Sequence, residues 1–178
     1  MKKVCFSALF LSIALLGCAS LKPVSGGTVL PNGKYLINES ESVQIEISRI
    51  AVGTQLARIE VRLMNNSIEP QNIDYTKTVI MTDLGEQLQP LDPSKAASSV
   101  SADAMSVAIA GRKGTQSAIE SSKGEIMREG IGQATLQSKG FIQGVFFFSP
   151  PTHPYKIINV KFIGVPGNPE VSFKKIGE

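Results

Sequence analysis

The sequence predicts a mainly β fold, an antiparallel β-sandwich that carries a two-helix insertion. Short segments in which apolar and polar residues alternate recur along the chain, and this period of two is typical of strands with one buried face. Glycine, proline, asparagine and aspartate separate these segments, as expected of turns. Between residues 92 and 130 the apolar spacing changes to three and four, which indicates helices.

The first strands are expected to form a hairpin. A short strand over 34–37 precedes it, apolar residues alternate over 43–50 and 57–63, and residues 52–54 make the turn between them. Asn65 and its neighbours then end the second strand. The sequence Asn-Asn-Ser that begins at Asn65 also matches a glycosylation acceptor, but turn formation is the favoured interpretation.

Two further strands are expected over 78–82 and 87–91, with a turn at 83–85. Asp92 then suits the cap of a helix that begins at Pro93, because a proline at the first helical position loses no hydrogen bond.

Small apolar residues mark one face of this helix, and Gly111 is its expected end. They are spaced by three, four and three: Ala97, Val100, Ala104 and Val107. The stripe either packs on the protein's own sheet, which is the favoured interpretation, or lets a partner backbone approach closely. Ser117 and Glu120 have the spacing of a capping box for a second helix, which is expected to end near Gly130.

Strands return after the helices. In the segment 140–148 three consecutive phenylalanines require cover on both faces of the strand, and Gly140 and Gly144 are expected to mark either bulges or positions where neighbouring backbone comes near. Strands over 155–164 and 170–175 complete a set of seven or eight. Such a set of short alternating strands in one domain predicts two packed sheets of immunoglobulin-like type.

Three segments resemble the telokin-like immunoglobulin-type domains of bacterial envelope lipoproteins. They are "RLMNNS", "DLGEQLQPL" and "GFIQGVFFF", which lie between Arg58 and Phe148. The resemblance implies a sandwich fold in the cell envelope and no catalytic residue to transfer. The helical insertion, about 92–130, departs from the compact pattern of that family.

The first residues have the features of a secretory signal. Lys2 and Lys3 precede an uncharged apolar run over 4–16, whose helix of roughly 20 Å is too short for a hydrocarbon core of about 30 Å. Leu15, Leu16, Gly17 and Cys18 then resemble the lipobox of bacterial lipoproteins. The resemblance implies cleavage before Cys18, a diacylglycerol on its sulfur and a third acyl chain on the new amino terminus.

These features divide the chain into three parts: a cleaved lipoprotein signal peptide over 1–17, a flexible tether over 18–33, and a sandwich domain over 34–178. Acyl chains on Cys18 would hold the protein on a membrane. Ala19 differs from the aspartate that resembles an inner-membrane retention signal. By that analogy we expect the outer membrane, with the domain facing the periplasm.

The composition argues against nucleic-acid binding and disulfides. The 18 basic side chains include Lys2 and Lys3, so 16 remain in the mature chain against 15 acidic ones. This balance provides no strong field for a phosphate backbone. Cys5 leaves with the signal and Cys18 carries lipid, so the domain has no free thiol.

No residue pattern predicts a catalytic, cofactor or metal site. His153 stands in a proline-rich turn without an acid or thiol close in sequence, which is a poor metal site. Ser172 and Lys175 match a Ser-x-x-Lys spelling on an expected strand, and this match is attributed to chance. Asp74 and Asp83 are expected to bond turn backbone separately. The segment "GIGQAT" lacks the order of a dinucleotide loop.

Two hypotheses of function follow. The first is a non-catalytic, membrane-anchored envelope lipoprotein that acts as a binding or structural module in the periplasm, with an envelope protein as partner and the helical insertion as recognition element. The alternative is a small-ligand carrier or enzyme with a pocket between the helical insertion and the sheet, for which an apolar cavity with a few polar groups is expected.

Overall fold

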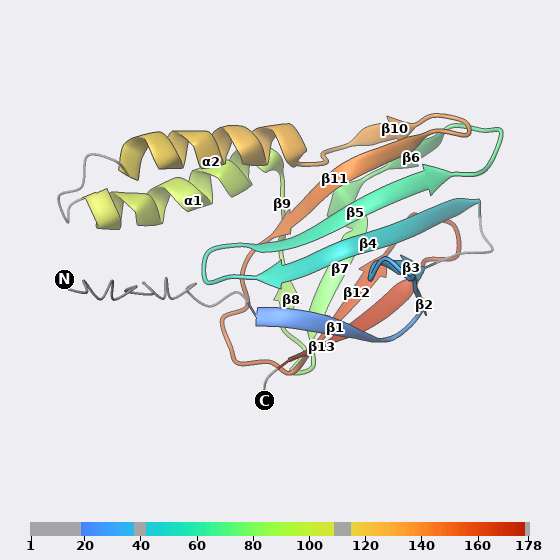
Figure 1. Cartoon of the computed structure of the whole chain (residues 1–178), viewed down its shortest axis with the longest axis horizontal. Helices are drawn as coiled ribbons and strands as arrows, with labels where there is room; N and C mark the ends of the chain where they lie inside the picture. Colours follow the sequence, from blue (N-terminus) through green and yellow to red (C-terminus); the bar gives the residue numbers. More distant parts are fainter. Residues whose placement is uncertain (1–18, 38–41, 109–114, 177–178) are drawn as a thin grey trace, which may run out of the picture.

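Most strands of the computed structural model belong to two antiparallel sheets that pack face to face (Figure 1). The structure describes residues 19–37, 42–108 and 115–176. Two helices extend from one side of the first sheet, past its end. The predicted β-sandwich with a two-helix insertion is therefore confirmed.

The first sheet, sheet A, is built around the predicted hairpin. Strand β4 (Val43–Val52) pairs with β5 (Ala57–Asn65), with one shift of register between Ile47 and Arg49. Strand β11 (Phe141–Phe148) pairs with the other side of β5. Three short strands complete this sheet: β2 (Thr28–Val29), β3 (Tyr35–Ile37) and β9 (Pro90–Leu91).

The second sheet, sheet B, has β12 (Ile157–Phe162) near its middle. It contains four further strands: β8 (Gln87–Leu88), β7 (Thr78–Thr82), β13 (Glu170–Lys175) and β1 (Ala19–Ser25). Strand β1 belongs to both sheets, because Ala19 and Ser20 pair with β4 whereas the residues from Leu21 onward pair with β13. It therefore closes one side of the sandwich.

The flexible tether predicted over 18–33 is wrong in its described part. Residues 19–25 form β1, and Leu21 packs against the core. Pro23 hid this strand from the sequence pattern, although it sits at a register shift, where a strand tolerates proline. Gly26 is a packing residue: its φ is +96°, and a Cβ there would lie 2.2 Å from the carbonyl oxygen of Glu170.

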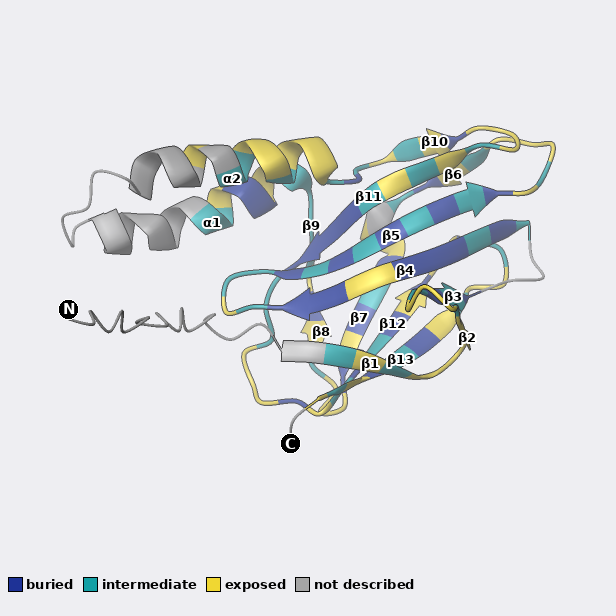
Figure 2. Cartoon of the chain, in the orientation of Figure 1, coloured by how far each residue is buried: buried dark blue, intermediate teal, exposed yellow. Residues whose placement is uncertain are grey.

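The core lies between the two sheets (Figure 2). On β5 the residues alternate between buried and half-buried along the whole strand, as the sequence predicts. Aromatic contacts cross from sheet to sheet: the rings of Phe146 and Phe162 lie 6.4 Å apart, and those of Tyr35 and Phe173 lie 5.8 Å apart, centroid to centroid. Burial of this apolar surface is the main force that holds the sheets together.

Both faces of β11 are covered, as its three phenylalanines predict. Phe146 and Phe148 point into the core between the sheets. Val145 and Phe147 point to the other face, where they pack with Ala96 of helix α1 (Pro93–Ala108) and Ile126 of helix α2 (Thr115–Glu129). One short strand thus joins the sandwich to the pair of helices, which we call the helical arm.

The start of α1 matches its prediction, whereas that of α2 does not. The Asp92 carboxylate accepts a hydrogen bond from the backbone N–H of Lys95 at 2.9 Å, so it caps α1. Helix α2 begins at Thr115, so Ser117 lies inside the helix and its predicted capping box is wrong. The predicted end near Gly130 is confirmed. Gly111 lies outside the described residues, as do the side chains of Ala104 and Val107.

The strand predicted over 87–91 is two strands in different sheets. Leu88 is buried in sheet B, whereas Pro90 and Leu91 pair with β11 of sheet A. Polar and apolar residues still alternate where the chain passes from sheet B to sheet A, so the sequence pattern alone does not reveal that the strand is divided. Two short strands had no sequence prediction: β6 (Gln71–Ile73) and β10 (Ala134–Leu136), which pair with each other. A 3-10 turn, η1 (Tyr75–Lys77), leads from β6 to β7.

Candidate binding groove

A groove of about 540 Å³ lies between the helical arm and the outer face of sheet A. Its floor is formed by Val145 and Phe147 of β11 with Arg58 of β5. The β4–β5 turn, which includes Leu56, forms one wall. Val100 of α1 and four residues of α2 form the other: Ser122, Glu125, Ile126 and Glu129.

Two glycines set the close packing of the helical arm that forms this groove. A Cβ on Gly144 would lie 2.5 Å from the backbone oxygen of Glu129, so only glycine lets the end of α2 approach β11 this closely. A Cβ on Gly130 would lie 2.5 Å from the Pro93 ring, where the end of α2 meets the start of α1. Of the two alternatives expected at Gly144, a bulge or a close approach of backbone, the structure shows the close approach.

The groove combines an apolar floor with charges of both signs. Leu56 and Ile126 are half-buried against Phe147. Arg58 lies on the sheet side, and the exposed Glu125 and Glu129 lie on the helix side. The groove therefore offers apolar contact at its centre and ion pairing at its rim.

A second, polar hollow of about 410 Å³ adjoins the first and shares Glu129 and Val145 with it. It runs over Ser48, Glu60 and Gln143, the outward side chains of three neighbouring strands. Arg128 at its edge lies 3.4 Å from the Glu129 carboxylate. Together the two hollows form a continuous surface along α2 and the outer face of sheet A.

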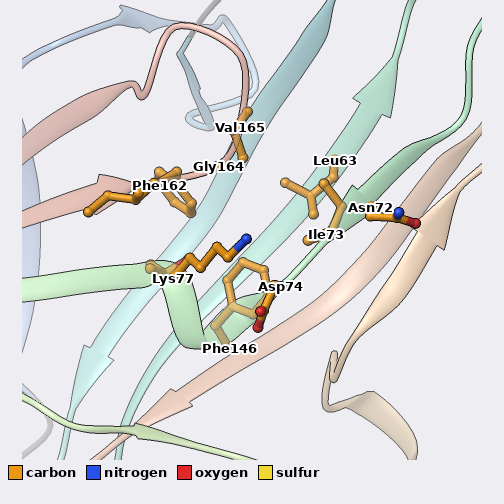
Figure 3. A pocket seen from close by; sticks show the side chains of 11 residues that line it. Leu63, Asn72, Ile73, Asp74, Lys77, Phe146, Phe162, Gly164 and Val165 are labelled. Carbon is orange, nitrogen blue, oxygen red and sulfur yellow. The ribbon is translucent and has the colours of Figure 1, made fainter.

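A third pocket opens at the opposite end of the sandwich, between the two sheets (Figure 3). Leu63, Phe146 and Phe162 line its inner part, while Asp74 and Lys77 lie nearer the surface. Its volume is only about 20 Å³, the room of a single water molecule. It is a gap at the edge of the core and too small for an organic ligand.

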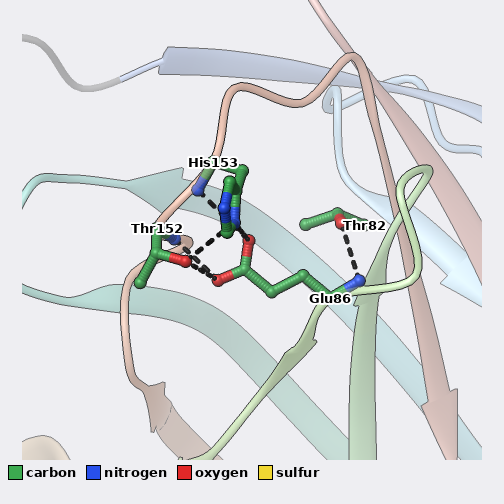
Figure 4. Close-up of polar contacts among 4 residues, drawn as sticks. All are labelled: Thr82, Glu86, Thr152 and His153. Atoms are coloured by element: carbon green, nitrogen blue, oxygen red, sulfur yellow. Dashed lines mark hydrogen bonds and ion pairs between the residues drawn. The ribbon is translucent and has the colours of Figure 1, made fainter.

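His153 has an acid neighbour that its sequence surroundings do not reveal. The Glu86 carboxylate, on the turn after β7, lies 3.4 Å from the imidazole Nδ1 (Figure 4). The same carboxylate accepts hydrogen bonds from the Thr152 backbone N–H and hydroxyl, each at 2.7 Å. These donors, the Thr152 backbone N–H first, lower the pKa of Glu86 to about 2. Glu86 thus holds the proline-rich loop between β11 and β12.

Replacing Glu86 by glutamine is expected to change how stability depends on pH. Because the pKa of the folded carboxyl lies below its ordinary value of 4.5, Glu86 stabilises the fold above about pH 4.5, and this contribution is lost as the pH falls toward about 2. The variant should therefore show a smaller loss of melting temperature between pH 5 and about 2.5. Thermal unfolding across this range measures the effect.

The matched control is Glu69→Gln, since Glu69 is exposed and its carboxylate makes no hydrogen bond to a described residue. This variant should keep the acid sensitivity of the original protein. Equal pH profiles for Glu86→Gln and the unmodified protein would contradict the assigned role of Glu86.

The other predicted polar residues lie apart from one another. Asp74 accepts from the Thr76 hydroxyl at 2.6 Å, and Asp83 accepts from the backbone N–H groups of Lys156 and Ile157, so both are separate turn acids, as expected. The Thr76 hydroxyl lowers the pKa of the Asp74 carboxyl, and the backbone N–H of Lys156 lowers the pKa of the Asp83 carboxyl.

Ser172 donates to the Asn159 side chain at 2.6 Å, whereas the Lys175 ammonium lies 5.7 Å from the centre of the Tyr155 ring. The two residues are three positions apart on one strand and point to opposite faces, so the Ser-x-x-Lys spelling forms no pair.

The segment "GIGQAT" follows helix α2. A dinucleotide loop would require a strand before it.

Cys18 and the signal residues 1–17 lie outside the described part of the chain. Among residues that the structure describes, no three His, Cys, Asp or Glu side chains gather as metal ligands would. None of the described helices has both the length and the apolar character that crossing a membrane requires.

No protein-family model matches this chain, and no curated protein matches its sequence. The crystal structure of the yjhA protein from Bacillus subtilis is similar in part, with 10% sequence identity and a TM-score of 0.41. The similar region covers 80% of this chain and 78% of that protein. A similarity of this degree supports no statement about function.

Proposed function

We propose that this protein is a non-catalytic, lipid-anchored lipoprotein of the bacterial envelope that binds a partner protein through the groove beside its helical arm. Acyl chains on Cys18 hold it on the outer membrane, with the domain in the periplasm. The groove of about 540 Å³ between the arm and sheet A is the observation that supports the binding role. The lipobox-like residues Leu15 to Cys18 support the anchor.

The chemistry of the groove suits a protein partner. Protein interfaces have an apolar centre surrounded by a polar rim. Here Leu56, Ile126 and Phe147 provide the centre, while Arg58 and Glu125 belong to the rim. The groove also continues into the polar hollow along α2, which gives a longer surface than a small molecule would cover.

Crosslinking in living cells tests the binding site. A photo-reactive amino acid at Thr54 or Glu125, both exposed at the groove, should capture one envelope protein. The same amino acid at Gln87, exposed on β8 of the other sheet, is the matched control and should capture far less of it. Capture of the same protein at equal yield from Gln87 and from the groove would refute the assignment of the groove.

The volume of the groove also favours a second candidate function, the binding of a small apolar ligand. Native mass spectrometry of the purified protein distinguishes the two. A small molecule that is retained by the unmodified protein and lost from a Val100→Trp variant, whose larger side chain fills the groove, would favour the carrier.

The anchor makes a separate prediction. Changing Cys18 to serine removes the sulfur that would carry diacylglycerol, so the protein should move from the membrane pellet to the soluble fraction or keep its uncleaved leader. Changing Cys5 to serine is the control, because this residue leaves with the signal. Both outcomes can be read from the mass of the amino-terminal peptide and from cell fractionation. An unmodified Cys18 peptide in the original protein would exclude the anchor.

A further inference from the structure

We propose that the end of sheet B at which β1 begins lies against anionic lipid headgroups, and that Lys22, Lys174 and Lys156 make this contact. The inference rests on the proposed acyl anchor at Cys18 and adds to it an orientation and a lipid preference. It follows from where the chain enters the fold and from an arrangement of charges that the fold itself does not explain.

The entry point leaves no slack between the predicted anchor and the sandwich. Ala19, the residue after Cys18, already pairs with Val52 of β4. Lys22 follows Cys18 by four residues, so their Cα atoms can be no more than about 14 Å apart. A domain held this closely must rest one end on the membrane surface, and β1 determines which end.

Lysines gather at that end of sheet B. Lys22 of β1 and Lys174 of β13 are direct partners in the antiparallel register, and both are exposed. Lys174 is in turn the partner of Ile157 on β12, and the exposed Lys156 precedes that residue. Lys22 and Lys174 therefore lie at the same level of two neighbouring strands, and Lys156 lies one residue beyond them, where its backbone oxygen accepts from the Lys175 N–H.

Opposed lysines are unfavourable within the fold alone. Like charges directly opposite on a sheet repel each other, and neither Lys22 nor Lys174 forms a salt bridge with a described residue. Of the nearby acids, Asp83 accepts the backbone N–H groups of Lys156 and Ile157 and its charge attracts the Lys156 ammonium, so it serves Lys156 and leaves Lys22 and Lys174 opposed. Glu86 holds Thr152. Glu170 pairs with Lys161 toward the other end of β13.

A surface of lipid phosphates supplies the missing countercharge. A lysine close to an anionic bilayer favours binding by about fivefold, so three favour the contact by roughly a hundredfold before the cost of orienting the domain. Because the acyl chains already hold the protein at the surface, the lysines act on its orientation.

The test uses the full acylated protein on vesicles, with the labelling rate of each lysine by a water-soluble amine reagent as the readout. On vesicles that contain phosphatidylglycerol, labelling of Lys22, Lys156 and Lys174 should fall by about tenfold relative to phosphatidylcholine vesicles, and 0.5 M salt should restore it. Lys77 and Lys139, which lie toward the opposite end of the sandwich, should label equally in all conditions.

A variant pair makes the test specific. In Lys22→Gln with Lys174→Gln, Lys156 should lose most of its protection, whereas Lys77→Gln with Lys139→Gln should leave it unchanged. Equal labelling of the three lysines on both kinds of vesicle would overturn the inference. Flotation on phosphatidylcholine vesicles reports the anchor independently, since it needs acyl chains and no charge. A protein that floats there but shows no lysine protection would keep the anchor and lose this inference.

Discussion

Replacing Phe146 by alanine is expected to lower the free energy of unfolding by about 3–5 kcal/mol. Phe146 is 2% exposed and contacts Phe162 of the opposite sheet, so its removal leaves a cavity where sheets A and B meet. In a close-packed interior the neighbouring side chains cannot move far enough to fill the space that the ring leaves. Chemical denaturation, with an unchanged slope against denaturant, measures the loss.

Two phenylalanines on the same strand are matched controls for Phe146. Phe141 is 59% exposed, and its ring lies 4.2 Å beneath the Arg62 guanidinium, so Phe141→Ala should cost no more than about 1 kcal/mol. Phe147 is buried beneath the helical arm, so Phe147→Ala should mainly speed hydrogen exchange in α1 and α2. A similar loss of stability in Phe141→Ala and Phe146→Ala would contradict the assigned core.

The change Asn65→Asp is expected to destabilise the protein by about 3 kcal/mol or more. Asn65 is 1% exposed, and its amide nitrogen donates to the backbone oxygens of Glu69 and Gln137 at 2.7 and 3.1 Å. Its side-chain oxygen accepts from the backbone N–H of Ser67 at 2.9 Å. A carboxylate would keep the last bond but would set a negative oxygen against carbonyl oxygens.

The same substitution one position along gives the control. Asn66 is exposed, so Asn66→Asp should change the unfolding free energy by no more than about 0.5 kcal/mol. Urea titrations of the two variants measure the difference. The hydrogen bonds of Asn65 indicate that it holds the end of β5 to the turn after β10. Equal stabilities of the two variants would contradict this role. Because its amide is buried and bonded, the folded domain does not offer Asn65 for glycosylation.

The position of the groove could be predicted only in part. The requirement for cover on both faces of Phe146–Phe148 correctly implies that something packs on the outside of sheet A, and the change of period identifies the helices. Arg58 and Leu56 carry no such signal, because their neighbours in sequence are ordinary strand and turn residues. They join the groove only because the helical arm returns over the β4–β5 turn.

Local structure could be predicted from the sequence where side chains alternate along a whole strand, because burial on one face imposes that period on β5 and β12. The sequence also specified the cap at Asp92, since capping depends on neighbours in the chain.

Features that depend on distant partners arise only in the folded chain. Strand β1 forms because β4 and β13 accept its backbone bonds, β6 and β10 form only as a pair, and Glu86 meets His153 across 67 residues. Such pairings bring together segments far apart in sequence. Their stability comes from hydrogen bonds and burial that no local pattern records.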